Sequence, residues 1–135
     1  MSQENVDLIM RHADAATRQD VEAFLATVSP DVEWEDAMWF SEPMRVYRGR
    51  DEVRQCFERA VVEPWESFRL EVEEVVPAGE DCIAAGGVVA GRGRSSGAEV
   101  KLHGWMTFWV SDGLITRRRP FLDRAEALEA AGLSE

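Results

Sequence analysis

The stretch Asp31-Val-Glu-Trp-Glu-Asp36 lies between two helical patterns and predicts a β-strand. Strand side chains alternate between two faces, so Val32, Trp34 and Asp36 share one face while Glu33 and Glu35 take the other. A carboxylate on an apolar face costs several kcal/mol unless it is paired or protonated. Asp36 therefore either ends the strand in solvent or lines an apolar pocket, where a raised pKa would suit it for proton transfer.

Helical spacing of apolar residues precedes and follows this strand. Residues 4–18 predict a first helix, and Asp20 caps a short second helix that we expect Pro30 to end. The segment Ala37–Arg48 is expected to be a loop, and Asp51 to open a third helix that carries Cys56 on its apolar stripe.

From Ser67 onward the pattern changes to strands. Apolar residues alternate up to a break in phase at Glu73-Glu74, which indicates a bulge. Further strands are expected over Cys82–Ala90, Val100–Val110 and Leu114–Leu122, and Asp123-Arg-Ala-Glu126 predicts the start of a last helix. We therefore predict one α+β domain over residues 1–135. Its curved antiparallel sheet would form a cone around three helices of the N-terminal half, followed by a C-terminal helix.

Charge and composition limit the partners. The net charge is −11, from 15 basic and 26 acidic residues, which disfavours nucleic-acid binding. We find no apolar run long enough to span a membrane and no signal peptide, so we expect a cytoplasmic protein without membrane contact. Cys56 and Cys82 lack metal-ligand spacing, and His12 and His103 are the two histidines, so we expect free thiols and no metal.

Four motifs in this order resemble the SnoaL-like branch of the nuclear transport factor 2-like superfamily. They cover most of the chain: Asp20-Val-Glu-Ala-Phe-Leu, Tyr47-Arg-Gly-Arg-Asp-Glu-Val-Arg, Asp112-Gly-Leu-Ile and the segment from Phe121 to Leu133. The resemblance implies the cone-shaped fold. It does not select one function, because the fold hosts isomerases, cyclases, epoxide hydrolases, dehydratases and binders without activity.

The resemblance also assigns site residues. Asp36 matches the general-base aspartate of ketosteroid isomerase, and His12 matches its oxyanion-binding tyrosine. Met106 falls where that enzyme has a second, protonated acid, so half of the isomerase oxyanion hole is absent. The epoxide-hydrolase branch would require polar groups at Gly86, Val88 and Pro120. We therefore reject that chemistry.

Several side chains could complete a pocket around Asp36. His12 lies at the edge of the apolar stripe of the first helix. It is either a surface or structural histidine, or a functional one that faces Asp36 and donates to a substrate oxygen or orients the carboxylate. Arg118 would bind a substrate carboxylate or enolate, or would pair with Asp36 and make it a poor base. Trp34, Trp39 and Tyr47 are either plain core or the wall of a pocket for a flat apolar ligand.

The strand Val100–Val110 is apolar on both faces. In our register His103, Trp105, Thr107 and Trp109 lie on the outer face, and a shift of one residue would turn them into the pocket. Trp105 and Trp109 suit a homodimer interface better than open solvent.

Two functions remain open. The first is an isomerase or cyclase without a cofactor, in which Asp36 removes a proton next to the carbonyl of a polycyclic or otherwise apolar ketone. In this scheme His12 and Arg118 stabilise the enolate, and Trp34, Trp39, Tyr47 and Met106 surround the substrate. The alternative is a binder of a small apolar molecule without catalysis. The missing second acid favours the binder, and the Asp36/His12 pair favours the enzyme.

Overall fold

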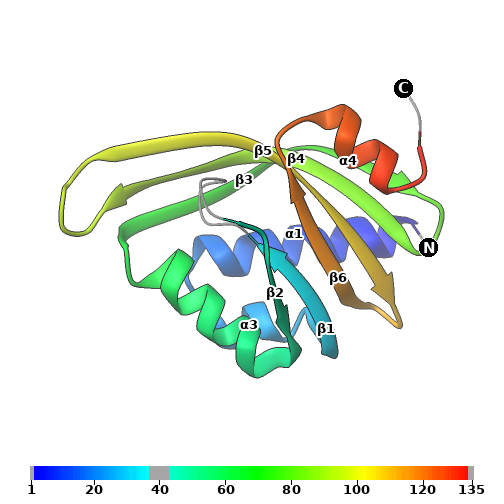
Figure 1. The fold of residues 1–135 in the computed structure, drawn as a ribbon, viewed down its shortest axis with the longest axis horizontal. Helices are drawn as coiled ribbons and strands as arrows, with labels where there is room; N and C mark the ends of the chain where they lie inside the picture. The colour runs from blue at the N-terminus through cyan, green and yellow to red at the C-terminus, as the bar shows by residue number, and fades with distance from the viewer. Residues whose placement is uncertain (1, 37–42, 134–135) are drawn as a thin grey trace.

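The computed structural model describes residues 2–36 and 43–133 (Figure 1). Its helices and strands follow the predicted order of helices first and strands second. They are α1 (Ser2–Thr17), α2 (Val21–Leu25), β1 (Val28–Asp36), β2 (Arg45–Arg48), α3 (Gly49–Phe57), the π-helical turn η2 (Glu58–Val62), β3 (Trp65–Ala78), β4 (Cys82–Gly93), β5 (Glu99–Ser111), β6 (Leu114–Phe121) and α4 (Arg124–Ala130).

The six strands form one curved sheet in the order β2-β1-β6-β5-β4-β3. All neighbours run antiparallel except β1 and β6, which are parallel. The α+β cone with a C-terminal helix is thus confirmed, and the parallel pair is a detail that the sequence pattern did not predict. In Figure 1, α1 and α3 lie on one side of the sheet and α4 lies on the other.

The inner side of the sheet and the helices share one apolar core. Val28 and Val32 on β1, Val53 on α3 and Ile115 on β6 are fully buried and belong to this core. Complete burial of such a side chain stabilises the fold by about 1.5–3 kcal/mol relative to exposure. The alternation predicted for β1 is confirmed, because Val32 and Trp34 are buried while Glu33 is exposed.

Three local predictions were wrong. Pro30 does not end α2, which stops at Leu25; it lies inside β1, where the register with β6 shifts between Val28 and Glu33. A shift of register tolerates a residue that has no N–H to donate. The predicted loop Ala37–Arg48 contains the edge strand β2, which is too short and exposed to show an apolar pattern. The third helix begins at Gly49 rather than Asp51.

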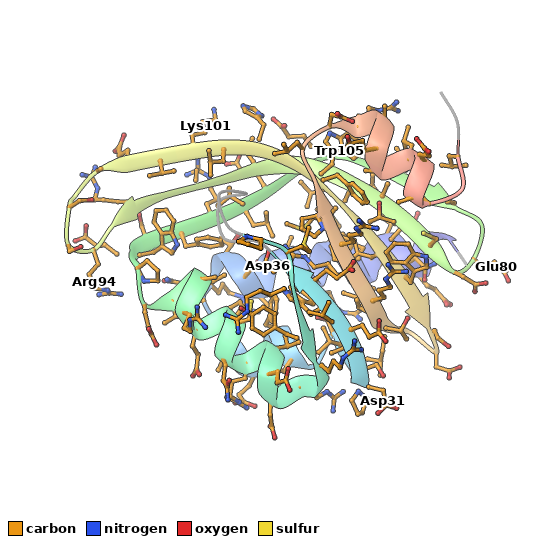
Figure 2. All side chains as sticks on the ribbon, in the orientation of Figure 1. Asp31, Asp36, Glu80, Arg94, Lys101 and Trp105 are labelled. Atoms are coloured by element: carbon orange, nitrogen blue, oxygen red, sulfur yellow. The ribbon has the colours of Figure 1, made fainter. Side chains whose placement is uncertain are left out.

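The outer face of β5 is partly covered within the chain. Trp105 and Thr107 lie on this face, as our register predicted, and α4 packs against them. The Thr107 hydroxyl donates to the Ala127 carbonyl over 2.8 Å, and Figure 2 shows Trp105 beside α4. α4 therefore covers part of the face that we assigned to a homodimer interface. The homodimer remains a prediction.

Within the described part of the chain, no helix is both long enough and apolar enough to cross a membrane.

Candidate small-molecule site

A cavity of about 170 Å³ lies between the helices and the inner face of the sheet. Its wall is mostly apolar and aromatic, with ring side chains from several elements: Phe24, Trp34, Phe57, Phe68 and Phe108. Six ionisable side chains also line it: the exposed Glu71 and His103, and the less exposed His12, Asp36, Cys56 and Arg118. An apolar cavity with few polar groups is the usual form of a small-molecule site.

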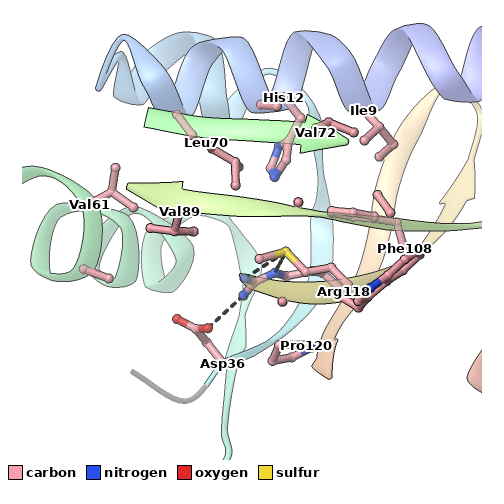
Figure 3. Close-up of a pocket in the computed structure, with 18 of the residues that line it drawn as sticks. Ile9, His12, Asp36, Val61, Leu70, Val72, Val89, Phe108, Arg118 and Pro120 are labelled. Carbon is pink, nitrogen blue, oxygen red and sulfur yellow. Dashed lines mark hydrogen bonds and ion pairs between the residues drawn. The ribbon is translucent and has the colours of Figure 1, made fainter. Parts of the chain in front are cut away.

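At one end of the cavity Asp36 and Arg118 form an ion pair (Figure 3). Trp34 and Arg118 are partners in the parallel pairing of β1 and β6, so their side chains lie side by side on the inner face. Arg118 Nη1 donates to Asp36 Oδ1 over 3.0 Å and to the Glu35 carbonyl over 3.1 Å. The Arg118 side chain is 8% exposed and that of Asp36 is 19% exposed. Of the two roles predicted for Arg118, this geometry supports the pairing with Asp36.

The remaining contacts of Arg118 are weaker. Its Nε and Nη2 groups point to the thioether sulfur of Met106 over 3.3 and 3.2 Å, and its Cζ atom lies 4.4 Å from the centre of the Trp34 ring. A thioether is a poor hydrogen-bond acceptor. A ligand oxygen is a better acceptor than this sulfur, so the donors beside Met106 could bind a carbonyl or an enolate.

Cys56 supports Asp36 from α3. Its thiol lies 3.4 Å from Asp36 Oδ2 and is placed to donate to it. Burial, together with the nearby Asp36 carboxylate, raises the pKa of Cys56 to about 12, so the thiol keeps its proton. Sequence analysis assigned Cys56 to the plain core. Its spacing on the helical stripe gave no sign of a carboxylate partner 20 residues away.

At the other end, His12 extends from α1 toward the cavity (Figure 3) and is 3% exposed. The Thr27 hydroxyl donates its one hydrogen to the Phe24 carbonyl over 2.6 Å, so it accepts from His12 Nδ1 over 2.8 Å. Burial, with a smaller effect from the positive charge of Arg118, lowers the pKa of His12 to about 3. His12 is therefore neutral, with its hydrogen on Nδ1 and a lone pair on Nε2.

The donor role predicted for His12 does not fit this arrangement. Nε2 has no hydrogen to give to an enolate, and its lone pair would repel one. The aromatic rings around it lie close: the centre of the imidazole is 4.4 Å from that of Phe24 and 5.5 Å from that of Trp34. His12 is thus a buried acceptor in an aromatic wall.

The structure brings most of the predicted site residues to one cavity. His12, Trp34, Asp36, Met106 and Arg118 all line it. Tyr47 is not among the lining residues; it is the cross-strand partner of Trp34, packs against the main core and interacts with Cys56. Trp39 lies outside the described residues. Residues 2–36 and 43–133 contain no group of three or more His, Cys, Asp or Glu side chains that could hold a metal ion.

Comparison with known protein families identifies the chain. Residues 9–118 match the model of the SnoaL-like domain, so the protein belongs to the SnoaL-like domain family. This confirms the resemblance drawn from the four motifs. A search of curated proteins found no match.

Solved structures share the fold. A candidate polyketide cyclase from Xanthomonas campestris pv. campestris is 23% identical, with a TM-score of 0.75 over 96% of this chain and 98% of that one. A candidate hydroxylase from Streptomyces galilaeus is 16% identical, with a TM-score of 0.74 over 98% and 83%. A protein with a ketosteroid isomerase-like fold from Catenulispora acidiphila, solved with trimethylamine, is 16% identical, with a TM-score of 0.73 over 93% and 92%. At these identities the likeness supports the fold alone.

Proposed function

We propose that the protein binds a small apolar carbonyl compound in this cavity and moves a proton next to the carbonyl, as an isomerase or a cyclase without a cofactor. The observation that carries this proposal is the Asp36–Arg118 pair at the end of an otherwise apolar cavity. A carboxylate can take a proton from carbon, and a guanidinium can stabilise the negative oxygen that results.

The charge balance of the step favours this arrangement. The proton leaves the carbon next to the carbonyl and joins Asp36, and the electron pair of the C–H bond moves to form an enolate. Negative charge thus passes from the carboxylate to the enolate oxygen, and Arg118 can contact either one through different N–H groups. Return of the proton from Asp36 to another carbon would complete an isomerisation. In a cyclisation the enolate carbon would attack a second carbonyl of the same molecule, and the alkoxide that forms would take the proton from Asp36.

The size of the cavity limits the ligand. Its volume of about 170 Å³ is little more than the roughly 150 Å³ of an engineered cavity that binds benzene. We therefore propose a ligand of one or two rings rather than the polycyclic ketone that the family resemblance first suggested.

Binding without catalysis is the second candidate, and the ion pair is the observation that favours it. The Arg118 guanidinium contacts Asp36 Oδ1 at 3.0 Å and the Cys56 thiol contacts Oδ2 at 3.4 Å, so both oxygens that could take a proton from carbon already have partners. Met106, in place of a second acid, also leaves the oxyanion site with fewer donors.

Hydrogen exchange separates the two functions. We expect the protein to speed the incorporation of deuterium next to the carbonyl of 2-tetralone in D₂O, followed by NMR. Asp36→Asn should reduce the catalysed rate by about 10²–10⁴-fold, because it removes the base. Glu33→Gln is the matched control: it changes an exposed acid of the same strand to its amide and should leave the rate unchanged. Binding of 2-tetralone without faster exchange would favour the binder, and exchange that survives in Asp36→Asn would contradict the assignment of the base.

A further inference from the structure

The end of the cavity at His12 selects for a chemical group that the proposed proton transfer does not use. His12 is 3% exposed, and Nδ1 is held by Thr27. No described residue is hydrogen-bonded to Nε2, although His12 lines the cavity. Nε2 is not among the fully buried atoms that lack a partner, so it is open to the cavity, and a ligand donor that reaches it gains a hydrogen bond.

The partner of Nε2 must be a hydrogen-bond donor. Thr27 gives its hydroxyl hydrogen to Phe24, so the imidazole hydrogen is fixed on Nδ1 and Nε2 is left as an acceptor. Anionic groups are excluded, because two lone pairs repel each other. Cationic groups are disfavoured by the apolar surroundings and by the positive charge of Arg118, which already acts on His12.

We propose that the ligand carries a neutral hydroxyl group, of a phenol or an enol, that donates its hydrogen to Nε2 of His12. Thr27 is the positioning residue, because it fixes which nitrogen accepts. This deepens the proposed function and rests on it for the location of the ligand: the substrate class becomes a hydroxylated carbonyl compound, with its hydroxyl toward α1 and its carbonyl toward Arg118 on β6.

The Trp34 ring links the two ends of such a ligand. The centre of this ring lies 5.5 Å from that of His12 and 4.4 Å from the Cζ atom of Arg118. A flat ring in the cavity could therefore pack against Trp34 while its substituents face the imidazole and the guanidinium. Aromatic packing of this kind adds to the area that the ligand buries.

A matched pair of ketones tests the inference: 4-hydroxyacetophenone and 4-methylacetophenone, which differ by a hydroxyl in place of a methyl group. Calorimetry of the full chain should show that the hydroxyl compound binds about five- to tenfold more tightly, as expected for one net hydrogen bond. His12→Phe keeps an aromatic ring and should abolish this preference. Thr27→Val should weaken it, because the imidazole hydrogen can then move to Nε2, and Thr27→Ser should retain it.

Nitrogen NMR of the ¹⁵N-labelled histidine ring reports the positioning role directly. We expect a protonated Nδ1 and an unprotonated Nε2 in the wild type and in Thr27→Ser, and a mixture in Thr27→Val. Addition of 4-hydroxyacetophenone should shift the Nε2 resonance, and the methyl compound should not.

The possible failures can be told apart. Equal binding of the two ketones, a preference that survives in His12→Phe, or a hydrogen found on Nε2 would overturn the inference and leave the cavity and its proton transfer standing. A preference for the hydroxyl compound, without exchange next to the carbonyl of either 2-tetralone or 4-hydroxyacetophenone, would support the inference and refute the proton transfer. Failure of both ketones to bind would refute the inference, and exchange in 2-tetralone would then decide separately whether the proton transfer stands.

Discussion

The two ends of the cavity are both buried, but they solve the problem of a buried polar group in different ways. At β6, Arg118 keeps its charge by pairing with Asp36 at 3.0 Å. At α1, no acidic residue of the described part of the chain pairs with His12, and burial lowers its pKa to about 3, so it stays neutral. A buried charge must be paired or removed. The end at Arg118 can therefore balance a negative charge that develops on a ligand, whereas the end at His12 can only accept a hydrogen bond from a neutral donor.

Loss of the Asp36–Arg118 ion pair should have the largest effect on the free energy of unfolding. Arg118→Leu leaves the Asp36 carboxylate beside an apolar wall without its partner, and we expect a loss of about 3–5 kcal/mol in the free energy of unfolding. The double variant Asp36→Asn/Arg118→Leu should recover much of this loss. Urea unfolding measures both.

Arg117→Leu is the control for the charged end. It removes the neighbouring arginine, which stacks on Trp109 on the outer face and is 40% exposed. Its cost should stay within about 1 kcal/mol, because its ion pair with Glu35 is long at 3.6 Å and Arg119 lies equally close to the same carboxylate. A loss from Arg118→Leu no larger than that from Arg117→Leu would show that the inner pair is not a buried one.

The lowered pKa of His12 should make the free energy of unfolding depend on pH. The folded protein binds a proton at His12 only near pH 3, whereas the unfolded chain binds one below about pH 6.5. The unfolded state is therefore favoured as the pH falls from 6.5 toward 3. The contribution is about 1.4 kcal/mol per pH unit, or about 2 kcal/mol at pH 5.

Urea unfolding at pH 7 and pH 5 measures this effect. His12→Phe should remove the extra loss at pH 5, and His103→Gln, on the exposed face of β5, should keep it. The same dependence in wild type and His12→Phe would mean that His12 is charged in the folded protein, and the contrast between the two ends would fail.

The smallest effect on the free energy of unfolding is expected for loss of the Thr27 hydroxyl, which accepts a hydrogen bond from His12. Thr27→Val removes the acceptor of Nδ1 while keeping the shape of the side chain, and should cost about 1 kcal/mol in the free energy of unfolding. Thr27→Ser should cost less, because it keeps the hydroxyl. If Thr27→Val is as stable as the wild type, the Thr27–His12 bond does not hold the ring.

Sequence analysis could predict the fold because its evidence is local. Alternation in Val32, Trp34 and Asp36 indicated the inner face of β1. The apolar period of β5 placed Met106 with the main core and Trp105 on the side of α4, although Trp105 also borders the cavity. Pro30 and the strand Arg45–Arg48 were missed because a shift of register and a short exposed edge leave no periodic signal.

The chemistry of the site depends on contacts between distant residues, and these were only partly predicted. The pair of Arg118 with Asp36 was one of two predicted roles, and the parallel register of β1 and β6 selects it. The acceptor role of His12 was missed, because it depends on Thr27, 15 residues away, and on the carbonyl that Thr27 itself bonds. No spacing in the sequence encodes which nitrogen carries the hydrogen.

The central claim is that the cavity holds a hydroxylated carbonyl compound between its two unlike ends. A crystal structure with 4-hydroxyacetophenone tests it most directly. We predict that the ring lies against Trp34, with its hydroxyl within hydrogen-bond distance of His12 Nε2 and its carbonyl oxygen at the Arg118 nitrogens beside Met106. A ligand bound the other way round, or bound outside the cavity, would contradict the account.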